Sequence, residues 1–169
     1  MSDPRADDQF VVLLSEVENN GRQLLPPDQY TPREGWRYDL NDDPALTVEV
    51  TVLTKSVRLT GELIGEFTYR KEMAERLHKS GRSTNANRIA RNEAFEASQR
   101  LLESRSAVRP VMEGLYDINT AKTTVERLRE HLPEFVHLRV ADSDQPILWR
   151  VPLDEVDNWA LVQVQATSN

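Results

Sequence analysis

The three histidines are the side chains best suited to acid–base chemistry or metal binding, because an imidazole titrates near neutral pH and ligates metals. His131 and Glu134 are three residues apart, a spacing that suits two ligands on one helix face, but Pro133 breaks the helix between them. His137 falls in a segment typical of a strand. We therefore expect no metal site. The histidines support a small acid–base enzyme only if His131 or His137 meets a carboxylate in the folded protein.

Other motifs of catalysis are missing from the sequence. The chain has no cysteine, which excludes a thiolate nucleophile, a disulfide and a cysteine-ligated zinc. It contains no Gly-x-Ser-x-Gly turn, no Walker A loop and no dinucleotide fingerprint, and six glycines leave little material for a phosphate-cradling loop. The sequence therefore predicts no cofactor and favours a protein that is not an enzyme.

One stretch of the chain is strongly basic although the net charge is −7. Residues 70–91 carry seven Lys or Arg side chains against two glutamates. Backbone amides at the start of a helix, with arginines beside them, are suited to a phosphate or carboxylate. The competing interpretation is a solvated surface on which Glu72–Arg76 and Glu75–Lys79 form pairs within one helix. The candidate contacts for an anion or a nucleic acid are Arg76, Lys79, Arg82, Arg88 and Arg91.

A second candidate surface is aromatic. Tyr30, Trp36 and Tyr38 lie in residues 24–43, a proline-rich and acidic stretch that we expect to be an irregular connection. Tyr and Trp side chains often anchor protein interfaces, so the three aromatics could bind a partner. They could equally pin the connection to the protein's own core.

Most helices and strands follow from hydrophobic periodicity and from helix start and stop signals. We expect helices at about 8–20, 70–79, 84–104, 110–116 and 121–132, the last with Thr123 and Glu126 as a capping box. We expect strands at 135–140, 147–151 and 161–164, a helical turn at 154–159, and a frayed end after residue 164.

Residues 46–69 allow two interpretations. Val48, Val50 and Val52 alternate with polar residues, and the period of two continues through Tyr69, which favours two strands. A long helix that begins at Asp43-Pro44 is the alternative, because apolar residues also recur at spacings of three and four. The strands are the preferred interpretation because strand propensity and alternation agree.

The fold class expected from these elements is α+β in a single domain over residues 1–169. Two hairpin-like segments would form a small antiparallel or mixed sheet covered by helices. The alternative is a mainly α protein with a long helical hairpin at 44–105. No apolar run approaches the ~20 residues of a membrane span, and residues 1–8 do not resemble a secretory signal. We therefore expect a cytoplasmic protein that does not contact a membrane.

The leading functional hypothesis is a non-enzymatic protein that binds through a protein interface, as a subunit of a larger assembly. Its partner would be another protein or a second copy of the chain. The second hypothesis is a nucleic-acid-binding subunit that contacts RNA or DNA through the basic helix pair at 70–91. The third is the small enzyme with acid–base residues from the His131 and His137 region.

Overall fold

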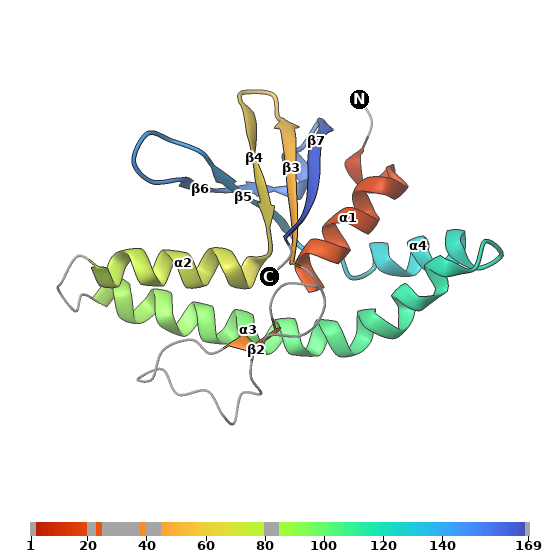
Figure 1. Ribbon diagram of the computed structural model, residues 1–169, viewed down its shortest axis with the longest axis horizontal. Helices are drawn as coiled ribbons and strands as arrows, with labels where there is room; N and C mark the ends of the chain where they lie inside the picture. The colour runs from red at the N-terminus through yellow and green to blue at the C-terminus, as the bar shows by residue number, and fades with distance from the viewer. Residues whose placement is uncertain (1–2, 20–22, 25–37, 40–44, 80–84, 168–169) are drawn as a thin grey trace.

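The computed structural model describes residues 3–19, 23–24, 38–39, 45–79 and 85–167, which fold into four α-helices, three short 3₁₀ helices and seven strands (Figure 1). The α-helices are α1 (Asp8–Asn19), α2 (Glu66–Lys79), α3 (Asn85–Met112) and α4 (Ala121–Arg129). The strands are β1 (Gln23–Leu24), β2 (Tyr38–Asp39), β3 (Ala45–Leu53), β4 (Arg58–Ile64), β5 (Phe135–Val140), β6 (Ile147–Pro152) and β7 (Asn158–Thr167). The 3₁₀ helices are η1 (Pro4–Ala6), η3 (Glu113–Tyr116) and η4 (Leu153–Glu155).

Five of the strands form an open antiparallel sheet in the order β6-β5-β4-β3-β7. All the helices of the middle of the chain are inserted between the hairpin β3–β4 and the strands β5 to β7. This arrangement confirms the expected α+β fold with an antiparallel sheet.

Residues 46–64 form a β-hairpin, so the alternative of a long helix beginning near residue 44 is wrong. Val48, Val50 and Val52 of β3 are fully buried on one face of the sheet, as a period of two requires. The turn after β3 is closed by Thr54, whose backbone N–H donates to the Val57 carbonyl at 2.9 Å. The β-branched residues therefore indicated the correct secondary structure of this segment, as strand propensity predicts.

Helix α1 covers one face of the sheet (Figure 1). Phe10 and Leu14 of α1 pack among the buried residues of β3, β4, β5 and β6. The carboxylate of Asp7 accepts hydrogen bonds from the amides of Gln9 and Phe10 and so caps the helix. Its other oxygen accepts from the Trp159 indole at 2.9 Å, and the Trp159 ring stacks on Phe10 at 4.8 Å. The start of β7 is thereby fixed to α1.

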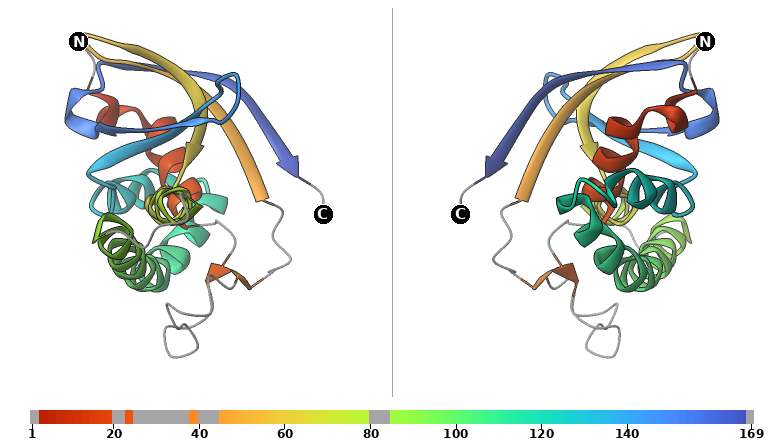
Figure 2. Two further views of the ribbon diagram at one scale, coloured as in Figure 1. Left: turned by 90° about the vertical axis from the view of Figure 1, so that its left-hand side faces the viewer. Right: turned by 90° about the vertical axis from the view of Figure 1, so that its right-hand side faces the viewer.

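Helices α2 and α3 lie antiparallel, side by side, at one end of the sheet (Figures 1 and 2). Buried alanines line their contact, which allows the two backbones to approach closely: Ala74, Ala90, Ala94 and Ala97. The side-chain amide of Asn87 on α3 donates to the Ala74 carbonyl on α2 at 3.1 Å. A second core cluster joins α1, α3 and α4 through Val11, Val108, Val111, Val125 and Leu128.

Several boundaries differ from the sequence-based expectation. Helix α2 begins at Glu66, so Phe67 and Tyr69 are helical rather than part of a strand. Helix α3 continues through Pro110 to Met112, and η3 follows it directly, so the short helix expected at 110–116 is divided between α3 and η3. The expected capping box of α4 is wrong, because Thr120 precedes the helix.

The end of the chain also differs. The turn expected at 154–159 is η4, and β7 starts at Asn158 and extends to Thr167, where fraying was expected.

The irregular connection expected at 24–43 lies mostly outside the described residues. Within it, Leu24 of β1 pairs with Tyr38 of β2, so this part of the connection contains regular structure. None of the helices in the described part of the chain is long and apolar enough to cross a membrane.

Candidate functional site

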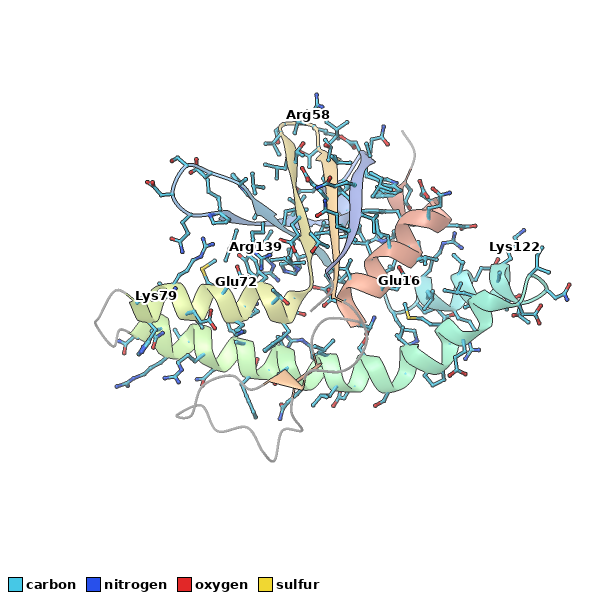
Figure 3. All side chains as sticks on the ribbon, viewed as in Figure 1. Glu16, Arg58, Glu72, Lys79, Lys122 and Arg139 are labelled. Carbon is cyan, nitrogen blue, oxygen red and sulfur yellow. The ribbon has the colours of Figure 1, made fainter. Side chains whose placement is uncertain are left out.

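The basic residues gather where α2 ends and α3 begins. Arg76 and Lys79 lie in the last turns of α2, and Arg88 and Arg91 lie in the first two turns of α3. Lys79 and Arg88 are exposed, while Arg76 and Arg91 are partly buried. Arg82 lies outside the described residues. Because the two helices are antiparallel, the structure places these four cations at one end of the helix pair, where Figure 3 labels Lys79.

The acids expected to neutralise these cations pair with other residues. Glu72 contacts Arg139 of β5, and the two side chains meet between α2 and the sheet (Figure 3). Glu75 pairs with Lys71 at 3.5 Å. The expected surface pairs Glu72–Arg76 and Glu75–Lys79 are therefore wrong. The end of the helix pair is left more positive than the sequence alone suggested.

Two of the three aromatic candidates lie outside the described residues. They are Tyr30 and Trp36. Tyr38 pairs through its backbone in β2. The aromatic interface stays a prediction.

The histidines do not form one site. His78 and His131 are exposed, whereas His137 is 2% exposed and its ring lies 4.6 Å from the Tyr69 ring of α2. Neither ring nitrogen of His137 has a hydrogen-bond partner among the residues that the structure describes. Burial, followed by the nearby cations Arg150 and Arg70, lowers the pKa of His137 to about 3. A neutral imidazole of this kind is a poor acid or base at neutral pH.

No group of three or more His, Asp or Glu side chains in the described residues could hold a metal ion.

His131 lines a cleft together with two glutamates, and sequence reasoning missed this cleft. The cleft has a volume of about 130 Å³ and lies between the end of α1, the start of α2, the middle of α3 and the loop after α4. Four segments that are distant in sequence therefore contribute to it. Its lining residues are Glu18, Glu66, Ala97, Arg100, Leu101, Ser104, His131 and Pro133.

Glu18 is the central polar group of this cleft. Both of its carboxylate oxygens accept from the backbone N–H of Glu66, at 3.1 and 3.2 Å, so Glu18 caps the start of α2. Gly65 lies against it, since a Cβ at this position would stand 3.4 Å from the carboxylate. Burial raises the pKa of Glu18 to about 7, against the lowering effects of the Glu66 amide and of Arg100.

The sequence held one signal for Glu18. Phe10, Leu14 and Glu18 recur at intervals of four, so the carboxylate continues the apolar face of α1. A charged residue in that position has either to turn away from the core or to find partners inside it.

The free edge of the sheet at β7 is the other feature that was missed. β7 has ten residues and carries no charged side chain. Leu161, Val162 and Val164 are 52%, 50% and 46% exposed. The register with β3 shifts between Glu49 and Val50, which leaves Val162 as an unpaired bulge residue. Beyond the anchored Trp159, the strand projects past the helices together with the start of β3 (Figure 2).

The opposite edge of the sheet is protected. β6 has six residues, contains Arg150 and ends at Pro152. The Arg150 guanidinium lies 3.5 Å from the Phe135 ring of β5 and covers it. A charge and a proline are common means by which natural sheets prevent their edges from pairing. β7 has neither.

A larger hollow of about 620 Å³ lies beside the turn that joins β3 to β4. Four carboxylates and two cations are among its lining residues, and Arg5 pairs with Asp154.

Comparison with protein families, curated proteins and solved structures found no match.

Proposed function

We propose that this chain is a protein-binding subunit that docks through β7, which adds an extended strand of its partner to the open sheet. The supporting observation is the uncharged ten-residue edge strand with three half-exposed apolar side chains. About half of the backbone N–H and C=O groups of an edge strand point away from its neighbour and are free to pair. Such an edge receives a strand by the same hydrogen bonds that build the sheet.

A second copy of β7 meets the requirements of this edge. Two copies related by a two-fold axis would pair antiparallel, and the residues that meet across the axis would bring no like charges together. This matters because each chain carries a net charge of −7, so that two copies repel each other unless their contact is free of like charges.

The test is the mass of the protein in solution, measured by light scattering over a range of concentrations. We expect the mass to rise from 19.4 kDa toward twice that value as the concentration increases. Val162→Lys should weaken the association by roughly tenfold or more, because it places a charge in an apolar strand contact. Ile147→Lys is the matched control, since Ile147 is 42% exposed on the opposite edge.

Two results would contradict the proposal of self-pairing. One is a mass of 19.4 kDa at every concentration. The other is an association that Ile147→Lys weakens as much as Val162→Lys does. A monomer that captures a defined partner through β7, with Val162→Lys again disruptive, would keep the docking function and replace the second copy by another protein.

The basic end of the helix pair supports a second candidate function, contact with RNA or DNA. The supporting observation is that Glu72 and Glu75 pair with Arg139 and Lys71, which leaves the cations at the end of α2 without these acids. Arg88 and Arg91 are three residues apart, so both can reach one phosphate strand.

The double variant Arg88→Ala/Arg91→Ala tests this contact in a titration with a single-stranded oligonucleotide at low and moderate salt. Each lost phosphate contact should reduce the log–log salt slope by about 0.7. Arg58→Ala is the control, because Arg58 is an exposed cation at the far end of the hairpin β3–β4 (Figure 3). Equal slopes for the wild type and the double variant would show an ordinary solvated surface.

A further inference from the structure

The cleft around Glu18 combines charge, hydrogen-bonding groups and an apolar wall in a small volume. Its 130 Å³ corresponds to about four water molecules at the density of the liquid. Ala97 and Leu101 of α3 and Pro133 form the apolar part of the lining. The polar part is formed by side chains from four different segments, so the folded chain has to bring them together.

The polar groups of the cleft differ in how many of their hydrogen-bonding positions are occupied by other side chains or by the backbone. The Glu66 carboxylate is held by Arg100, and Arg70 lies 4.0 Å from it on the same helix. The Ser104 hydroxyl donates to the side-chain oxygen of Asn19 at 2.8 Å, which leaves its own lone pairs to accept.

Asn19 is itself fixed, because its amide donates to the Ser15 carbonyl at 2.7 Å. Among the described residues, one backbone N–H donates to Glu18, although a carboxylate has about four acceptor sites. Acceptors therefore remain on Glu18 and Ser104.

We propose that this cleft binds a small primary amine in its ammonium form. The ammonium group has three N–H donors, which suit the remaining acceptors of Glu18 and Ser104. A short alkyl chain of about three carbons fits the remaining volume and lies against Ala97, Leu101 and Pro133. With Glu66 neutralised by Arg100, the charge that the ligand has to balance is the single negative charge of Glu18.

Other classes of ligand fit the cleft less well. An anion would approach the carboxylates of Glu18 and Glu66 without a cation free of its own partner, since Arg100 already holds Glu66. A divalent metal would need a set of convergent ligands, and no such group exists in the described residues. A neutral alcohol would leave the charge on Glu18 unbalanced.

Binding of an ammonium ion is coupled to the proton on Glu18. The charged groups that face Glu18 are Glu66 of α2 and Arg100 of α3, and His131 lies on the rim after α4. Because the pKa of Glu18 is raised to about 7, its carboxyl is mostly protonated at pH 6 and mostly ionised at pH 8. An alkylamine stays charged over this range, so its affinity should increase about tenfold from pH 6 to pH 8.

The experiment is a titration of the full chain with propylammonium chloride, followed by amide chemical shifts in NMR spectra at pH 6 and pH 8. We expect saturable shifts at the start of α2 and around Ser104, about tenfold tighter at pH 8. Propanol and butyrate at the same concentrations test the need for the positive charge, and neither should give saturable shifts in the cleft.

Glu18→Gln removes the charge and keeps an acceptor for the Glu66 amide, so it should weaken binding about tenfold or more and remove the pH dependence. Glu16→Gln is the matched control: Glu16 is on the same helix, burial also raises its pKa, and it lines a different groove between α1 and α4 (Figure 3). Equal binding by the wild type and Glu18→Gln, or equal shifts with propanol, would overturn the proposal.

Ser104→Ala provides a second test that does not touch the cap of α2. It should weaken propylammonium binding by several-fold and leave the pH dependence in place, because Glu18 still titrates. If Glu18→Gln does not fold, as judged by far-ultraviolet circular dichroism, the Ser104→Ala result decides. Unchanged affinity in a folded Ser104→Ala protein would then overturn the proposal.

Discussion

Glu18 and His137 are two titratable side chains that pack against the same helix, but they differ in their hydrogen-bond partners and in the charges that surround them. Glu18 lies at the start of α2, where a backbone N–H donates to it and Arg100 supplies a favourable charge. His137 lies against Tyr69 of the same helix, among aromatic rings and cations. Within the described part of the chain, neither of its ring nitrogens has a hydrogen-bond partner. The carboxylate is part of a cleft with polar partners, whereas the imidazole is enclosed.

Burial drives both groups toward their neutral forms, and this has opposite consequences for stability. The pKa of His137 falls from 6.5 to about 3, so its favourable contribution is complete above pH 6.5 and is lost as the pH decreases toward 3. The pKa of Glu18 rises from 4.5 to about 7, so its contribution is complete below pH 4.5 and is lost as the pH increases toward 7.

The difference shows that burial alone does not fix the pH dependence of a protein. Between pH 4.5 and pH 6.5 the two contributions change in opposite directions and partly cancel. The free energy of unfolding of the wild type should therefore vary less in this range than either group alone would cause.

Replacing His137 should give the largest effect. The His137 contribution amounts to on the order of 4 kcal/mol between pH 6.5 and pH 3, because each pKa unit corresponds to about 1.4 kcal/mol. His137→Phe removes this acid sensitivity. It also removes two buried nitrogens without partners, which should raise stability at pH 7 by about 1–3 kcal/mol. Urea unfolding at pH values between 4 and 7 measures both changes.

His131→Gln is the control for this prediction, because His131 is exposed. Its unfolding profile should follow that of the wild type. Parallel profiles for the wild type and His137→Phe would mean that the imidazole has an unrecognised partner in solution and that our account of its environment is wrong.

Local sequence predicted much of the fold. The alternation of Val48, Val50 and Val52 identified a strand, and the strand at 135–140 was confirmed with the same boundaries. What local pattern missed was the beginning of α2. The period of two continues from Leu63 to Phe67 and Tyr69, and the cap that starts the helix comes from Glu18, 48 residues away. A cap from a distant segment leaves no local signal.

The candidate sites were harder to predict than the helices and strands, because their side chains pair with residues that are distant in the sequence. Glu72 was expected to pair with Arg76 one helical turn away, but Arg139 lies between Glu62 and Glu72 in the folded chain and takes both acids. Contacts four residues apart are visible in a sequence, whereas a contact across 67 residues is decided by the sheet register.

His137 illustrates the same point. Val136 and Leu138 of β5 point into the core, and the alternation of the strand correctly places His137 on the other face of the sheet. A single antiparallel sheet often leaves that face to solvent. The register also pairs this histidine with Ile64 of β4 and Arg150 of β6, but the ring that buries it belongs to Tyr69 of α2. The position on the strand could be read from the sequence. The burial could not, because it follows from how α2 packs.

Replacing Glu18 should give a smaller effect than replacing His137, with the opposite sign. Its contribution is on the order of 3 kcal/mol between pH 4.5 and pH 7. Glu18→Gln does not titrate, so its stability relative to the wild type should be greater at pH 7 than at pH 4.5. The unfolding profile of Glu18→Gln should accordingly rise more steeply with pH than that of the wild type, because the His137 contribution is no longer opposed.

The double variant Glu18→Gln/His137→Phe completes the comparison. Glu18 and His137 share none of the partners described above, so their effects should add to within about 0.5 kcal/mol at each pH. The double variant should then lose both opposing slopes. A Glu18→Gln profile parallel to that of the wild type would show that Glu18 is ionised throughout. In that case water reaches the cleft freely, and the amine affinity expected above should no longer depend on pH.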